Sequence, residues 1–166
     1  VLIIKMSSEK KKIKIAVSGA SGRMGQAVIS QVLSSDAFEL AVALDRVDSN
    51  LIGYDAGSFC GNSSGVKITS DLSQIFLSKS DVLIDFSIPE STLKIIDACQ
   101  SEGLPLVIGT TGFSPKETKR IERFAANYGV VFSPNMSIGV NLTFKLLEVA
   151  SSLFKKNYDV EILESH

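Results

Sequence analysis

Three glycines in the spacing Gly-x-x-Gly-x-x-Gly are the residues of this chain whose types most clearly predict chemistry. They follow a short β-branched run, residues 13–17, and an amphipathic stretch follows them. In that strand–turn–helix context the first glycine permits a tight turn, the second lets backbone N–H groups approach a pyrophosphate, and the third lets the helix pack on its strand. The phosphate then lies at the positive end of the helix dipole. We therefore predict a pyrophosphate site at Gly19-Ala20-Ser21-Gly22-Arg23-Met24.

An acidic residue and an arginine follow the next predicted strand, residues 38–44. Asp45 lies about 20 residues after the last glycine, where a carboxylate accepts hydrogen bonds from an adenosine ribose. The guanidinium of Arg46 can pair with a 2′-phosphate through two hydrogen bonds. We therefore predict NADH and NADPH as cofactors, without a preference between them. The alternative is that Asp45 is a solvated charge at the end of a strand.

The composition excludes several classes of protein. The 166 residues include 17 Lys and Arg against 18 Asp and Glu, for a formal net charge of −1, so neither nucleic acid nor a membrane surface is expected as a partner. No apolar run approaches the ~20 residues of a membrane span. Cys60 and Cys99 are too few for a disulfide framework or a metal cluster, and we expect reduced thiols in a cytoplasmic protein without a bound metal.

Strand and helix patterns alternate through the first three quarters of the chain. This alternation, with near-continuous apolar strands, predicts an α/β fold, a Rossmann-type doubly wound parallel sheet with helices on both faces. Helix starts are predicted at Asp71, in a capping box with Gln74, at Pro89, and at Ser114, in a capping box with Glu117. The strands are predicted at residues 13–17, 38–44, 66–69, 81–86, 104–109 and 130–132, and the helix from Pro89 is predicted to end near residue 102.

The helix faces and one connection can also be predicted. The helix after the glycine turn is expected to bury Met24, Val28, Val32 and Leu33, and the helix after Ser114 to bury Ile121, Phe124 and Ala125. The polar, glycine-rich stretch 48–65 is too long for a standard connection and is expected to be a functional or a mobile loop.

Ligands of doubly wound sheets bind beyond the carboxyl ends of the strands, at the switch point of the strand order. Five segments follow predicted strands and are the candidates for such a site, although turns use glycine, serine, asparagine and proline for purely structural reasons as well. They are Gly19–Gly25, Asp45-Arg46, Phe86-Ser87, Gly109-Thr110-Thr111-Gly112 and Ser133-Pro134-Asn135-Met136.

The pattern changes after Asn135. One long helix is expected over residues 137–156, followed by a half-buried strand over residues 158–166, where apolar and polar residues alternate. A strand that ends the chain on its one histidine suggests a truncated second domain. We divide the chain into an N-terminal extension (1–12), a dinucleotide-binding domain (13–136) and the start of a second, α+β domain (137–166).

The segments that follow the strands resemble a known family, the 4-hydroxy-tetrahydrodipicolinate (dihydrodipicolinate) reductases of bacterial lysine and diaminopimelate synthesis. The most specific motifs are Gly109-Thr110-Thr111-Gly112-Phe113 and the run from Asn135 to Asn141. The glycine turn, Asp85-Phe86-Ser87 and the run from Glu161 to His166 complete the resemblance, which extends from about Ile13 to the last residue.

The resemblance implies an NAD(P)H-dependent oxidoreductase that reduces a small cyclic dicarboxylate, as a cytoplasmic homotetramer when full length. It implies that the Gly-rich turn holds the pyrophosphate, that Asp45 and Arg46 contact the adenosine ribose, and that Phe86 and Ser87 lie beside the cofactor. Many relatives carry Ala-Ala-Asn-Phe at the last segment, so contacts there are expected through the backbone. The segments that line the nicotinamide side would be Gly109, Thr110 and Thr111, and Ser133, Pro134, Asn135 and Met136.

The resemblance assigns a catalytic role to one residue of this sequence. In the resemblance, His166 matches a histidine that donates or accepts a proton, and residues 137–166 begin the substrate-binding and tetramerisation domain. The lysine and the Gly-Thr pair of the family's catalytic segment do not occur before the sequence stops. We therefore expect a polypeptide of these 166 residues to bind cofactor without measurable reductase turnover.

Three other classes of protein are alternatives to this one. A short-chain dehydrogenase needs Tyr-x-x-x-Lys, and neither Tyr54, Tyr128 nor Tyr158 has the lysine. An aldehyde-type dehydrogenase needs an activated cysteine, whereas Cys60 and Cys99 are better explained as loop and core residues. A non-catalytic NAD(P)-binding Rossmann module would share the glycine turn but would not need the motif from Gly109 to Phe113.

Overall fold

The structure is a computed structural model that describes residues 11–154, 158–159, 161 and 163. It contains two compact units, one up to Phe132 and one from Ser133 onward, which are described separately. Among the described residues, no helix is long and apolar enough to cross a membrane.

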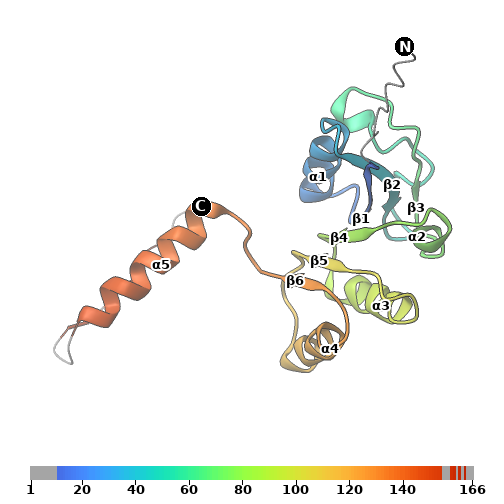
Figure 1. The fold of residues 1–166 in the computed structure, drawn as a ribbon. Coiled ribbons are helices and arrows are strands. Elements are labelled where there is room, and N and C mark those ends of the chain that lie inside the picture. The colour runs from blue at the N-terminus through green and yellow to red at the C-terminus, as the bar shows by residue number, and fades with distance from the viewer. Residues whose placement is uncertain (1–10, 155–157, 160, 162, 164–166) are drawn as a thin grey trace, which may run out of the picture. The chain divides into compact units, whose positions relative to one another are not determined.

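The first unit is built on a six-stranded parallel sheet in the order β3-β2-β1-β4-β5-β6 (Figure 1). The strand order reverses between β1 and β4, which are hydrogen-bonded neighbours. This is the order of a Rossmann-type doubly wound sheet, so the predicted fold class is confirmed. The strands are β1 (Ile13–Ser18), β2 (Phe38–Leu44), β3 (Ile68–Thr69), β4 (Val82–Asp85), β5 (Leu106–Ile108) and β6 (Val130–Phe132).

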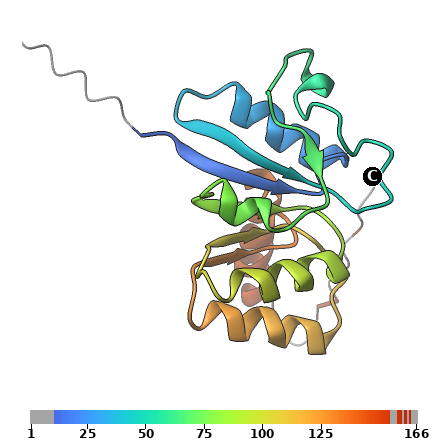
Figure 2. The same cartoon turned by 90° about the vertical axis from the view of Figure 1, so that its right-hand side faces the viewer.

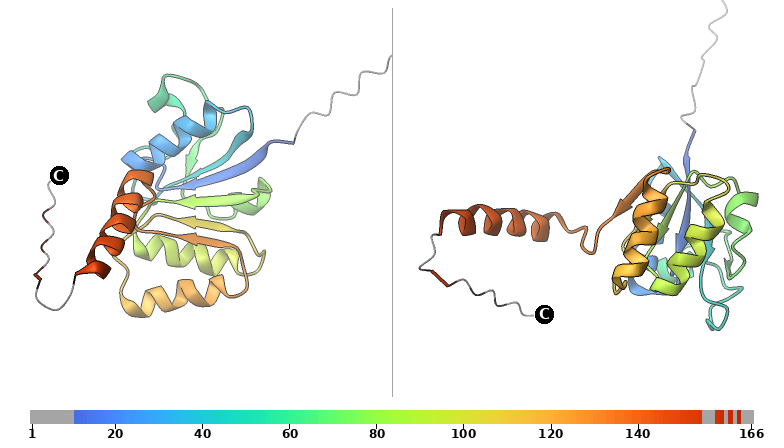
Figure 3. Two further views of the ribbon diagram at one scale, coloured as in Figure 1. Left: turned by 60° about the vertical axis from the view of Figure 1, so that its left-hand side comes forward. Right: turned by 90° about the horizontal axis from the view of Figure 1, so that it is seen from below.

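Two apolar clusters hold helices against the two faces of the sheet. Alternate residues of β1 supply both, because successive side chains of a strand point to opposite faces: Ile15 and Val17 join one cluster and Ala16 the other. The first cluster packs α1 (Arg23–Leu33), and the second packs α2 (Gln74–Leu77), α3 (Pro89–Cys99) and α4 (Pro115–Ala125). Figures 2 and 3 show α3 and α4 side by side along the sheet.

The helix starts test the capping predictions. Both hydrogen bonds of the capping box at α4 are present: Ser114 Oγ accepts from the Glu117 N–H at 3.4 Å, and the Glu117 carboxylate accepts from the Ser114 N–H at 2.7 Å. The prediction for Asp71 is wrong, because α2 begins only at Gln74. The Asp71 carboxylate instead accepts from the Ser73 N–H at 3.0 Å and from the Gln74 amide at 3.1 Å, and so closes a turn before the helix.

Two residues predicted to be buried are exposed. Met24 is 51% exposed, and the buried stripe of α1 is Gly25, Ile29 and Val32. Helix α1 packs closely on the turn through Gly25, because a residue without a side chain lets its backbone approach that of Gly19 and Ala20, and this turns Met24 outward. On α4, Ile121 and Phe124 are buried as predicted, but Ala125 is exposed, just beyond the stripe that packs toward α3.

The connection after β2 is shaped by hydrogen bonds to one side chain. A single carboxylate, that of Asp55, organises it by accepting from the N–H groups of Gly57 at 2.7 Å, Ser64 at 2.9 Å and Gly65 at 2.8 Å. The hydroxyl groups of Ser63 and Ser64 donate to it as well. These hydrogen bonds keep the pKa of Asp55 well below its usual value, the Ser64 N–H contributing most and the Gly57 N–H next.

Several element boundaries differ from the predictions by a few residues. Helix α3 ends at Cys99, earlier than predicted, and Gly103 follows in a left-handed conformation (φ +69°) that ends the turn. In the second unit, α5 spans Ile138–Leu153, and the Ser137 hydroxyl accepts from the Val140 N–H at 3.4 Å. Of the strand predicted at 158–166, the described residues 158, 159, 161 and 163 are not in a strand. Alternation marks a possible buried face but does not supply the neighbouring strand that a ladder requires.

Candidate functional site

The turn between β1 and α1 has glycine where the backbone leaves no room for a side chain. Gly19 has φ +75°, and a Cβ built on it would overlap the Phe86 carbonyl oxygen. A Cβ on Gly25 would overlap the Gly19 carbonyl oxygen. Gly22 differs in degree, because it is exposed, has φ −73°, and a Cβ built on it would make a tight contact of 3.2 Å with the Gly19 oxygen and not an overlap. The space beyond Gly22 is therefore open to a ligand.

Backbone hydrogen bonds fix the shape of this turn. The Ala20 N–H donates to the Leu44 carbonyl and the Gly22 N–H to the Gly19 carbonyl, both at 3.0 Å. The first helical N–H groups of α1, those of Arg23, Met24 and Gly25, have no acceptor among the residues that the structure describes. No side chain caps the helix at Gly22. An anion is the natural partner for such free N–H groups at the positive end of a helix.

Asp45 is joined to the glycine turn by a hydrogen bond. Its Oδ2 accepts from the Ser21 N–H at 2.8 Å and its Oδ1 from the Arg46 N–H at 2.8 Å. A carboxylate has about four acceptor positions, so each oxygen can accept a further hydrogen bond from a ligand. Arg46 is exposed, and its Nε lies 3.2 Å from Asp48 Oδ1, in a surface ion pair that costs little to break.

A second polar cluster lies beneath the segments that follow β4 and β5, and sequence reasoning did not identify it. The buried Asp85 Oδ2 accepts from the hydroxyl groups of Thr92 and, at 3.2 Å, of Thr110. Its Oδ1 is buried and has no partner within the described part of the chain. A buried unsatisfied oxygen costs about 1–3 kcal/mol. Asp85 could have been found as a charged residue inside an otherwise apolar strand.

The structure separates the two predicted threonines of this region. Thr110 is 3% exposed and its Oγ1 accepts from the Ser87 N–H at 2.9 Å, whereas Thr111 is exposed. The side chain of Thr110 therefore faces the protein, and only its backbone can line a site. A Cβ on Gly109 would overlap the ring of Phe86, so this ring fills the space above the glycine.

The segment Ser133–Met136 belongs to the second unit and is described within it. The Ser133 hydroxyl donates to the Asn135 carbonyl at 2.8 Å. The Asn135 side chain accepts from the Ser137 N–H at 2.8 Å, and its carbonyl accepts from the Asn141 amide at 2.9 Å. This local network shapes the start of α5. The prediction that the segment lines the nicotinamide side stays a prediction, and His166 lies outside the described residues.

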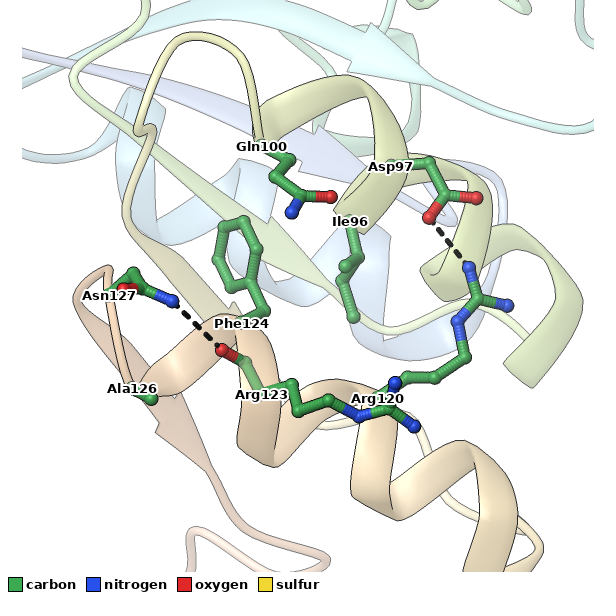
Figure 4. A pocket seen from close by; sticks show the side chains of 8 residues that line it. All are labelled: Ile96, Asp97, Gln100, Arg120, Arg123, Phe124, Ala126 and Asn127. Carbon is green, nitrogen blue, oxygen red and sulfur yellow. Dashed lines mark hydrogen bonds and ion pairs between the residues drawn. The ribbon is translucent and has the colours of Figure 1, made fainter.

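A hollow between α3 and α4 is distinct from these segments (Figure 4). Its wall includes Arg123, Phe124 and an ion pair of 2.6 Å between Arg120 and Asp97. The lining residues come from the C-terminal halves of both helices and from the residues just after them. In a parallel α/β sheet those halves lie toward the amino ends of the strands, at the edge opposite the glycine turn. The hollow therefore holds none of the predicted site residues.

The cysteines behave as structural residues. Cys99 is buried in the core, and burial raises the pKa of its thiol to about 12, which opposes formation of the thiolate that a nucleophile needs. Cys60 is half-buried in the loop after β2. Within the described residues no group of three or more His, Cys, Asp or Glu side chains could hold a metal ion.

Comparison with known proteins agrees with this geometry. A family model described as "Dihydrodipicolinate reductase, N-terminus" matches residues 13–136. The 4-hydroxy-tetrahydrodipicolinate reductases of Ralstonia nicotianae and Bordetella parapertussis are 49% and 50% identical over 154 and 153 residues, which are 93% and 92% of this chain. The matches cover 58% and 56% of those relatives, so the chain spans little more than half of their length.

Solved structures support the same assignment. A dipicolinate-bound dihydrodipicolinate reductase from Paenisporosarcina sp. TG-14 is 29% identical, with a TM-score of 0.70 over 87% of this chain and 55% of that one. An amine dehydrogenase from Mycobacterium smegmatis, 17% identical with a TM-score of 0.58 over 74% of this chain and 38% of that one, shares the fold alone. By its sequence and its fold, the chain belongs to the dihydrodipicolinate reductase family, of which it matches the N-terminal portion.

Proposed function

We propose that the first unit binds NADH or NADPH across the switch point between β1 and β4. The observation that carries this proposal is the joining of the glycine turn to Asp45 by the hydrogen bond from the Ser21 N–H. Through it, free helical N–H groups and a carboxylate face the same edge of the sheet. A pyrophosphate and an adjoining ribose require that pair of groups at that spacing.

The residues present fit such a cofactor. Backbone N–H groups of the turn from Gly19 to Met24 would hold the pyrophosphate, because side chains are absent where the chain approaches most closely. Asp45 would accept from the adenosine ribose and Arg46 would pair with a 2′-phosphate. The nicotinamide side would be lined by Gly109, Thr110 and Thr111, and Ser133, Pro134, Asn135 and Met136 are proposed as further contacts of the cofactor.

We further propose that the protein takes part in reduction of 4-hydroxy-tetrahydrodipicolinate, the activity for which its relatives are named. The nicotinamide, when bound, supplies a hydride. The protein's own part is to hold the cofactor and exclude other orientations, and His166 is proposed to donate or accept a proton. Residues 137–166 are proposed as the start of the substrate-binding and tetramerisation domain, and the cytoplasm as the place of action.

Arg46 tests the adenosine end of the proposed site. Arg46→Ala should weaken NADPH binding by about tenfold and leave NADH binding within about twofold, because only NADPH carries a phosphate for the guanidinium to pair with. Isothermal calorimetry of both cofactors measures this. Equal losses would show that Arg46 does not contact the 2′-phosphate, and no binding of either cofactor by the unaltered chain would contradict the proposed site itself.

His166 tests the proposed chemistry. In a form of the protein that shows turnover, His166→Gln should lower kcat by roughly 10²- to 10⁴-fold, the usual contribution of a proton donor or acceptor. The dissociation constant of NADPH should not change, because His166 is not proposed to touch the adenosine or the pyrophosphate. A variant with unchanged kcat would remove His166 from the mechanism.

A further inference from the structure

A buried cluster of three side chains ties together the segments that follow β4 and β5. Asp85 is 1%, Thr92 0% and Thr110 3% exposed. They come from the end of β4, the first turn of α3 and the turn after β5. Asp85 Oδ2 is the common acceptor for both hydroxyl groups. One carboxylate oxygen therefore joins three elements at the edge of the sheet where the candidate site lies.

The two hydroxyl groups depend on Asp85 to different degrees. Thr92 Oγ1 has a second acceptor on its own helix, the Ile88 carbonyl at 3.2 Å. Within the described residues, Thr110 Oγ1 has Asp85 as its one acceptor, and it accepts in turn from the Ser87 N–H at 2.9 Å. Since a hydroxyl has one hydrogen to donate, donation to Asp85 points a lone pair of Thr110 toward Ser87. Asp85 thus fixes Ser87 through Thr110.

Ser87 and Thr110 lie on one side of the switch point. Asp45, the proposed contact of the adenosine ribose, follows β2. The adenosine half of a dinucleotide would therefore lie over the ends of β1 and β2. The nicotinamide half must then extend over the ends of β4 and β5, where Ser87 and the turn from Gly109 to Gly112 lie. The backbone of these two segments would form its support.

We propose that Asp85 is a positioning residue for the nicotinamide half of the cofactor, acting through the hydroxyl of Thr110 on the backbone at Ser87 and Thr111. It does not touch the cofactor. This inference rests on the proposed cofactor site. It also explains why a charged residue with one unsatisfied oxygen occupies the buried end of β4. An apolar residue of similar size there would remove that unsatisfied oxygen but would leave the two segments without their link.

Thr110→Val is the decisive variant. It keeps the shape of the side chain and removes the hydroxyl that links Asp85 to Ser87. Asp85→Ala is less informative, because it deprives both threonines of their acceptor and lowers stability. Thr92→Val is the matched control, since it removes the other hydroxyl bonded to the same oxygen, on a helix that keeps its backbone hydrogen bonds. Thr110→Ser restores the hydroxyl and should restore binding.

The experiment measures the Kd of two ligands for the 166-residue chain. One is NADH, and the other is ADP, which carries the adenosine half without the nicotinamide. Thr110→Val should raise the Kd of NADH by about tenfold, the effect of about one hydrogen bond, and leave the Kd of ADP within about twofold. Thr92→Val should change neither Kd, although its thermal midpoint should fall. If the Thr110 hydroxyl had only a structural role, the Kd of NADH and the Kd of ADP would rise together.

Two results would overturn the proposal while leaving the cofactor site intact. One is a Thr110→Val variant with unchanged NADH affinity. The other is an equal loss of NADH and ADP affinity, in which Thr92→Val behaves like Thr110→Val. Failure of the unaltered chain to bind either probe would instead refute the cofactor site, and the role of Asp85 with it.

Discussion

The two sides of the switch point are built from different parts of the polypeptide. On the β1 side, the turn from Gly19 to Gly25 is shaped mainly by backbone contacts, although the side chains of Asp45 and Gln26 bond to Ser21. Gly19 and Gly25 are required there because the Phe86 and Gly19 carbonyl groups occupy the space of a Cβ. On the β4 and β5 side, the shape depends on side chains: the Asp85 carboxylate, the Thr110 hydroxyl and the Phe86 ring. The glycines of the first side lie within seven consecutive residues, whereas the second side joins residues that are 25 positions apart.

This difference determines how each side responds to substitution. The backbone-built turn fails when a side chain is added at Gly19 or Gly25, because the carbonyl groups in the way cannot move aside without disturbing β1 or α1. A side-chain-built segment can adjust, because rings and hydroxyl groups have rotamers. We therefore expect the largest losses of stability on the β1 side.

Gly19→Ala should give the largest loss of unfolding free energy. The left-handed conformation costs a non-glycine residue about 1–2 kcal/mol, and the overlap with the Phe86 carbonyl adds about 1–3 kcal/mol. Gly53→Ala is the matched control, because Gly53 also has a positive φ (+87°) but no atom within 4 Å of a built Cβ. Urea denaturation gives both free energies of unfolding. Equal losses for the two variants would show that close approach to Phe86 contributes nothing.

Gly109→Ala should give the next largest loss of unfolding free energy, about 1–3 kcal/mol, because the new Cβ would overlap the Phe86 ring. The ring is a side chain, so removing it should relieve the overlap. In a Phe86→Ala background, Gly109→Ala should therefore cost at least about 1 kcal/mol less than it does alone. Additive free energies in this double-mutant cycle would mean that the backbone, and not the ring, excludes a side chain at Gly109.

Asp55→Asn should give the smallest loss of stability. The dependence of that loss on pH identifies the carboxylate as its source. Because hydrogen bonds lower its pKa from the usual 3.8, its stabilising contribution is complete above about pH 4 and is lost as the pH falls further. The difference in thermal midpoint between the unaltered protein and Asp55→Asn should therefore shrink below pH 4. Asp36→Asn, at an exposed position, is the control. A difference that stays constant down to pH 3 would contradict the role of the carboxylate.

The same contrast explains what the sequence could predict. The glycine turn and the Ser114 capping box depend on contacts within a few residues or on a known spacing, and the structure contains both. The contact of Asp45 with a ribose stays a prediction. The ordering of the loop by Asp55 is also local, but a carboxylate that accepts five hydrogen bonds has no fixed sequence pattern.

The Asp85 cluster could not be predicted, because it forms only when the parallel register brings Ile108, and with it Thr110, beside the end of β4. The outward position of Met24 has a similar origin. Two apolar stripes, one through Met24 and one through Gly25, are compatible with the periodicity of α1. The close approach of Gly25 to Gly19 in the folded protein decides between them.

Gly22 allows the most direct test of the cofactor site, because it is the one glycine of the motif whose replacement should affect the ligand far more than the fold. It has an ordinary φ of −73° and is exposed. Gly129, exposed at the opposite edge of the sheet, with a built Cβ at 3.6 Å from Pro105, is the control position. We predict that calorimetry with NADH shows no measurable binding to Gly22→Leu, unchanged binding to Gly129→Leu, and nearly equal thermal midpoints. Unchanged NADH affinity in a folded Gly22→Leu protein would contradict a pyrophosphate site at this turn.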